Sequence, residues 1–159
     1  MALHKLHVDD FYDDSFSLIA IHCSLEDYRL AYLLNKHLNI SLVRKPQDLD
    51  YKYFAATYSI FEWEDKKQHT TWNLVSNICK REEDGLQSSG SLFNTSNTIL
   101  KTYHLLPEFK NVDYLIKVMN EDQSFDEKQI LDTLQSIPQL VTSYSIDVEH
   151  IKSKDNLIF

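Results

Sequence analysis

The chain has 159 residues and a mass of 18.7 kDa, which is enough for one ordinary domain. Only two glycines and three prolines are present, which excludes collagen-like and low-complexity proteins and disfavours enzymes built on a glycine-rich phosphate loop. The formal charge of −8 also disfavours nonspecific binding to a nucleic-acid backbone through clusters of Lys and Arg.

The first third of the chain predicts a strand, a helix and a second strand. The nearly continuous apolar run 16–23 is typical of a buried central strand. A capping box at 24–27 predicts the start of a helix that runs to about Leu38, with Asn39 as its C-terminal cap. A further strand is expected over 40–44.

Four more strand-like segments occupy the middle of the chain, at 53–63, 69–79, 99–106 and 112–119. The first two are joined by the charged turn 64–68 and predict a hairpin. The aromatic residues of this region fit cross-strand pairing better than stacking on nucleic-acid bases: Trp63, Trp72, Tyr51, Tyr53 and Tyr58. Segment 82–97 holds both glycines and predicts a flexible loop.

The last part of the chain predicts a second helix and a final strand. A capping box at 124–127 precedes apolar residues at helical spacing, and 139–148 alternates like a strand. The order is therefore β-α-β, then antiparallel strands, then β-α-β again. Right-handed crossovers would place both helices on one face of the sheet. We expect a single α+β domain over 1–159, a two-layer sandwich with a mostly antiparallel sheet and a ferredoxin-like part.

Three segments together point to a known family. Residues 106–114 read Leu-Pro-Glu-Phe-Lys-Asn-Val-Asp-Tyr, while 27–35 reads DYRLAYLLN and 153–159 reads SKDNLIF. They resemble the family known by the signature IPExxxVDY, with Leu106 in place of the usual Ile. The resemblance implies a small, cytoplasmic protein of the Bacteroidetes, and it brings no assigned activity.

The signature residues allow two interpretations. In the first, Glu108, Lys110, Asp113 and Tyr114 form an exposed cluster that contacts a ligand or a partner. In the second, the carboxylates bind backbone amides in a turn after Pro107, and Tyr114 fills the core.

A thiol site near the first helix is an alternative. Cys23 lies between a strand and a helix N-terminus, where a thiolate is favoured, and His22 precedes it. However, neighbours on a strand face opposite sides, and no third orienting residue is evident. The other interpretation, a Cys23 that packs as a small buried hydrophobe, is favoured, so we assign no catalytic residue.

Metal and phosphate motifs are incomplete. Potential ligands crowd the N-terminus (His4, His7, Asp9, Asp10, Asp13 and Asp14), but their spacing fits no zinc or calcium motif, and a solvated acidic segment explains them as well. Residues 85–90 have the glycine spacing of a phosphate loop without the Lys that follows it. We therefore predict no metal and no cofactor.

Apolar residues in polar surroundings are candidate contact sites for a partner. Leu92 and Phe93 lie in the loop 82–97, and Phe159 ends the chain; each either anchors to the core or inserts into another protein.

The acidic N-terminus does not match a signal peptide, and no apolar stretch is long enough to span a membrane, so we expect a cytoplasmic location. The predicted function is a non-enzymatic module that binds another cytoplasmic protein or itself. The alternative is a small-ligand binder or thiol enzyme with a site near Cys23.

Overall fold

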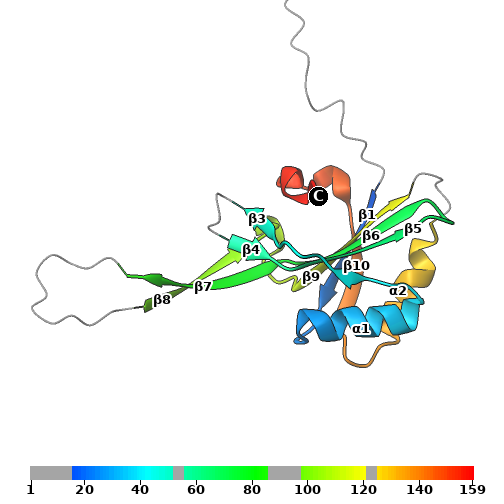
Figure 1. The fold of residues 1–159 in the computed structure, drawn as a ribbon, viewed down its shortest axis with the longest axis horizontal. Coiled ribbons are helices and arrows are strands. Elements are labelled where there is room, and N and C mark those ends of the chain that lie inside the picture. The colour runs from blue at the N-terminus through cyan, green and yellow to red at the C-terminus, as the bar shows by residue number, and fades with distance from the viewer. Residues whose placement is uncertain (1–15, 52–55, 86–97, 121–124) are drawn as a thin grey trace, which may run out of the picture.

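The computed structural model describes residues 16–51, 56–85, 98–120 and 125–159. Its largest sheet has six strands in the order β10-β1-β9-β6-β5-β2, and every neighbouring pair is antiparallel (Figure 1). These strands are β1 (Phe16–His22), β2 (Val43–Arg44), β5 (Ile60–Asp65), β6 (Thr70–Ser76), β9 (Tyr114–Asn120) and β10 (Thr142–Ile146). The predicted α+β class and mostly antiparallel sheet are confirmed.

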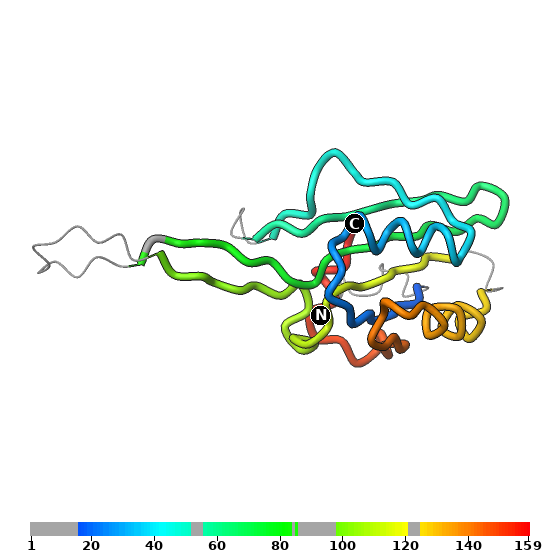
Figure 2. Tube along the Cα trace, turned by 90° about the horizontal axis from the view of Figure 1, so that it is seen from below, coloured from blue at the N-terminus to red at the C-terminus, as the bar shows by residue number. Residues whose placement is uncertain are grey.

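Two helices, α1 (Asp27–Leu38) and α2 (Glu127–Gln135), lie on one face of this sheet (Figures 1 and 2). They follow β1 and β9, so the chain order β1-α1-β6-β9-α2-β10 is that of a split β-α-β fold. These four strands lie side by side as β10-β1-β9-β6, which is the ferredoxin-like part. Buried side chains of both helices pack on the sheet to form a first core: Leu30, Ala31 and Leu34 of α1 and Leu134 of α2, against Ile19, Ile21, Leu74, Ile116 and Val118.

The opposite face of the sheet carries a second core. Leu18, Val75 and Leu115 are buried there beneath the hairpin of β3 (Leu49–Tyr51) and β4 (Ala56–Tyr58). The short helices η2 (Pro107–Phe109), η3 (Val148–His150) and η4 (Lys154–Leu157) complete this cover. Because both faces are covered, Leu18 to Ile21 of β1 are all fully buried, which explains the unbroken apolar run in the sequence.

The strands β7 (Ile78–Asp84) and β8 (Thr98–His104) form a two-stranded ribbon that projects from the body of the protein, hereafter the arm (Figures 1 and 2). Its register pairs Glu82 with Leu100 and Glu83 with Ile99. The predicted loop 82–97 is therefore wrong at its start, where residues 82–84 belong to β7; residues 86–97 lie outside the described part of the chain.

The helix ends follow the predicted caps only in part. Asn39 adopts the left-handed conformation (φ 55°) expected of a C-terminal cap. The capping box at 24–27 is wrong, because Glu26 is the N-cap and its side chain makes no capping bond. In α2 the cap is Asp126, which accepts a bond from the Gln129 amide at 3.1 Å.

Three predicted strands are interrupted. The segment 53–63 breaks at Ser59, and 69–79 breaks at Asn77. The segment 40–44 pairs only at its end, because the Asn35 side chain binds both backbone groups of Leu42, at 2.7 and 3.0 Å.

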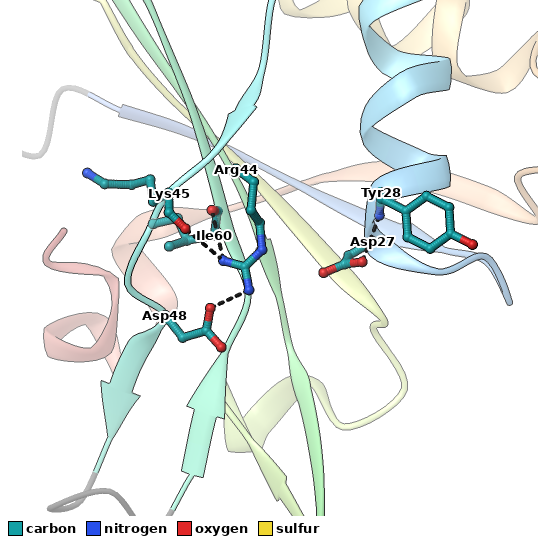
Figure 3. A network of polar contacts seen from close by, with 6 residues as sticks. All are labelled: Asp27, Tyr28, Arg44, Lys45, Asp48 and Ile60. Carbon is teal, nitrogen blue, oxygen red and sulfur yellow. Dashed lines mark hydrogen bonds and ion pairs between the residues drawn. The ribbon is translucent and has the colours of Figure 1, made fainter.

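Strand β2 is the last strand of the sheet, and Figure 3 shows the polar contacts of its Arg44. The Lys45 amide donates to the Ile60 carbonyl at 2.9 Å, and the Arg44 guanidinium reaches the same carbonyl and the Asp48 carboxylate. In the same view the Tyr28 ring extends from α1 into solvent. Within the described residues, neither helix is both long and apolar enough to cross a membrane.

Candidate functional site

The signature segment 106–114 is organised by Asn77, which is fully buried at the break between β6 and β7. The Asn77 side-chain nitrogen donates to the carbonyl oxygens of Phe109 and Val112 at 2.9 and 2.8 Å. Its side-chain oxygen accepts the Leu106 amide at 2.8 Å. One side chain therefore fixes the turn that returns the chain from the arm to the sheet.

Glu108 lies on this turn and holds the C-terminal segment. Its carboxylate accepts bonds from the Lys152 and Ser153 amides at 3.0 and 2.9 Å and from the Ser153 hydroxyl at 2.7 Å. Burial raises the pKa of Glu108, but these bonds outweigh burial and leave the pKa below its ordinary value. The Glu108 carboxylate thus forms its hydrogen bonds with the C-terminal segment of its own chain.

Asp113 and Tyr114 connect the same segment to the entrance of α1. The Asp113 carboxylate accepts the Cys23 amide at 2.9 Å, and the Tyr114 hydroxyl donates to the Leu25 carbonyl at 2.7 Å. Burial raises the pKa of Tyr114. Lys110 is exposed on the turn. The carboxylates bind backbone amides, as in the structural interpretation of the signature, but these amides belong to distant segments and not to the turn, and Tyr114 is only half-buried. A binding role for the signature residues stays a prediction.

Cys23 lines a shallow cleft of about 380 Å³ together with Asp113, Tyr114 and Lys80. Burial raises the pKa of the Cys23 thiol; the Leu25 amide opposes this rise, and the Asp113 carboxylate adds to it. A raised pKa favours the thiol over the nucleophilic thiolate.

The structure does not bring His22 and Cys23 together. Cys23 packs in the first core, between the sheet and the two helices. The His22 ring nitrogen Nε2 instead lies 3.2 Å from the Tyr144 hydroxyl on the adjacent strand β10. The alternation of a strand separates the two side chains, as the sequence predicts. This geometry does not offer His22 as a base for the Cys23 thiol.

Phe159 folds back onto the body of the protein. The centre of its ring lies 4.7 Å from the Lys117 ammonium nitrogen. The same nitrogen lies 4.9 Å from the centre of the Phe16 ring. The ammonium also donates to the Leu157 carbonyl at 2.7 Å, and burial lowers the pKa of Lys117.

Several predicted candidates lie outside the described residues: Leu92 and Phe93, and the N-terminal set His4, His7, Asp9, Asp10, Asp13 and Asp14. Among the residues that are described, no group of three His, Cys, Asp or Glu side chains could hold a metal ion.

A second, larger cleft than the one beside Cys23 was not predicted from the sequence. It has a volume of about 820 Å³ and lies between the end of α1, the β5–β6 turn and the start of α2. Trp63 and Trp72 line it, and they are directly opposite one another on β5 and β6, so cross-strand aromatic pairing is confirmed for these two residues. Tyr51 and Tyr58 instead face Ala56 and Leu49 across the β3–β4 hairpin, and Tyr53 lies outside the described residues. Phe125 joins them from the start of α2, with its ring 5.7 Å from that of Trp72. The aromatic pairs were the available signal, but the helix ends that close the cleft come from distant parts of the chain.

The arm presents a second surface that the sequence did not indicate. Ile99 and Leu100 of β8 are 58% and 62% exposed, and as consecutive strand residues they lie on opposite faces of the ribbon. On the Ile99 face, the Glu83 carboxylate accepts the Tyr103 hydroxyl and pairs with Lys101. The arm thus combines an ordered polar cluster with exposed apolar side chains.

No known family model, no curated protein and no solved structure matches this chain. The resemblance to the IPExxxVDY family stays a prediction. Function is therefore inferred from the residues and their geometry alone.

Proposed function

We propose that the protein is a non-enzymatic interaction module of the cytoplasm that binds another protein through the arm. The observation that carries this proposal is the exposure of Ile99 and Leu100 on a ribbon that projects from the body. Large apolar side chains left exposed, here one on each face of the ribbon, are candidate contacts for a protein partner.

Strand β8 is the side of the arm that suits a partner. Strand β4 packs beside β7, whereas the outer edge of β8 faces away from that hairpin. Exposed edge strands are usually protected by charged residues or proline, yet Lys101 is the one charged residue between Thr98 and Thr102. The proposed partner contributes an extended, apolar segment that pairs with β8 and covers Ile99 and Leu100.

Affinity capture of the tagged full chain from its native lysate, read by mass spectrometry, tests the proposal. A stoichiometric partner should be retained by the wild type and lost from the double variant Ile99→Thr/Leu100→Thr, because Thr keeps the strand propensity but removes apolar contact area. Val141→Thr is the matched control, since Val141 is 80% exposed near β10, away from the arm.

A photo-reactive side chain at position 100, but not at position 141, should label the captured partner. Retention of the partner by the double variant would overturn the proposal, as would the absence of any stoichiometric partner of the wild type. A wild-type dimer that the double variant converts to a monomer would replace the foreign partner with a second copy of this chain.

A further inference from the structure

We propose that the cleft lined by Trp63, Trp72, Thr70 and Phe125 binds a small neutral saccharide. The cleft is separate from the arm, so this inference goes beyond the proposed interaction function. Its volume of about 820 Å³ is within the range of roughly 300–1,000 Å³ typical of small-molecule sites.

The aromatic residues provide the apolar surface of the site. The rings of Trp63 and Trp72 are 6.4 Å apart and inclined by 44°, and Phe125 meets Trp72 edge to face at 68°. Trp72 is buried in the core, whereas Trp63 is only half-buried and lines the cleft. A half-buried indole offers a flat apolar face with a polar nitrogen at its edge, which suits the C–H face of a sugar ring.

Thr70 gives independent evidence for a ligand. It is only 6% exposed and lines the cleft, and its hydroxyl has no hydrogen-bond partner among the described residues. Strand alternation places Thr70 on the same face of β6 as Trp72. A buried hydroxyl without a partner costs about 1–3 kcal/mol, and a ligand hydroxyl in the cleft would remove this cost.

The charges around the cleft favour a neutral ligand. Three carboxylates, of Glu64, Asp65 and Asp126, line it together with two ammonium groups, of Lys66 and Lys67. Asp65 already accepts the amides of Lys67 and Gln68, and Asp126 caps α2. Neither sign of charge dominates, so the remaining polar atoms suit hydroxyl groups better than a phosphate or an ammonium ion.

The test is saturation-transfer NMR on the full chain with three probes: methyl β-D-glucoside, N-acetylglucosamine and cellobiose. At least one probe should bind the wild type. Thr70→Val should weaken that binding about tenfold, the equivalent of one hydrogen bond of roughly 1.4 kcal/mol. Thr71→Val on the same strand is the control, because Thr71 points to the other face and should bind like the wild type.

Trp63→Leu should abolish binding, and the melting temperature of each variant shows whether the fold is intact. Thr70→Val keeps the proposal testable if Trp63→Leu unfolds, because Val has nearly the shape of Thr. Failure of all three sugars to bind the wild type would overturn the proposal. So would equal binding by Thr70→Val, or binding of adenosine, a flat heterocyclic probe, without binding of any sugar. None of these outcomes depends on the arm.

Discussion

Asn77 shows how one polar side chain fixes an irregular part of the fold. It is fully buried, and besides its three side-chain bonds its backbone binds the Asp113 carbonyl and the Leu105 amide, both at 2.9 Å. Buried amides are tolerated where their hydrogen bonds are satisfied, and Asn77 meets this condition at the root of the arm.

Replacing Asn77 should therefore be costly. Asn77→Ala leaves the Leu106 amide and the carbonyls of Phe109 and Val112 without their partner, so the free energy of unfolding should fall by about 3 kcal/mol or more. Urea unfolding followed by circular dichroism measures the change. Asn111→Ala, at an exposed position of the same segment, should stay within about 0.5 kcal/mol of the wild type. A similar small loss for both variants would contradict the role given to Asn77.

The role of Asn77 was not predictable from the sequence. The stretch around it, Trp72 to Cys79, has the composition of one continuous strand. The carbonyls that Asn77 binds are 32 and 35 residues further along the chain. Local patterns contain no information about such partners, so the break in the strand was missed.

Among the elements, the arm has the least support. Two-stranded ribbons are marginally stable in water unless something packs on them, and Ile99 to Lys101 of β8 are exposed. The arm is therefore expected to open far more readily than the central strands β1 and β9.

Amide hydrogen exchange measures this difference. In the free protein, amides of residues 80–84 and 98–101 should exchange about tenfold or more faster than those of β9, which pairs on both sides. Binding of the proposed partner to β8 should slow the arm amides and leave β9 unchanged. Equal protection of the arm and β9 in the free monomer would contradict the expected difference in stability.

The regular elements were the predictable ones, because their apolar periodicity is local. The buried run of β1, the helix α1 and the hairpin of β5 and β6 around a charged turn follow from local patterns. The cleft next to Trp63 and Trp72 was not predictable, since Phe125 and the end of α1 reach it through tertiary packing. The capping box at 24–27 was wrong because the helix begins later, after Glu26.

At the scale of the whole molecule, the start of β1 and the last residue of the chain help to close the second core. Phe16 and Phe159, the first and last described residues, both contact the ammonium of Lys117 on β9. Lys117 is only 6% exposed, and its bond to the Leu157 carbonyl ties η4 to the sheet. The stability of the whole fold should consequently respond to the charge of this side chain.

The response to pH has a defined sign. Burial holds the pKa of Lys117 below the value of about 10.4 in an unfolded chain, so between these two values the unfolded chain binds more protons. The contribution of Lys117 to stability is complete at pH values above its pKa in the unfolded chain. It is lost as the pH falls through the lower pKa of Lys117 in the folded protein. Urea unfolding between about pH 7 and about pH 10 should show the wild type gaining stability relative to Lys117→Met.

The exposed Lys110→Met is the control, and it should follow the wild type at every pH. Parallel curves of unfolding free energy against pH for the wild type and Lys117→Met would show that burial does not lower the pKa of Lys117.

The position of the arm in the chain has a consequence for how this protein can vary. The arm and the signature segment together form an insertion, residues 77–113, between strands β6 and β9. These two strands are neighbours in the sheet, and Ser76 at the end of β6 pairs with Tyr114 at the start of β9. Length added to or removed from the end of the arm leaves that junction and both cores unchanged. Relatives and engineered versions can therefore differ in the length of the arm while they keep the same sheet and cores. A foreign binding segment grafted at the end of the arm would be carried by a fold whose stability does not depend on that segment.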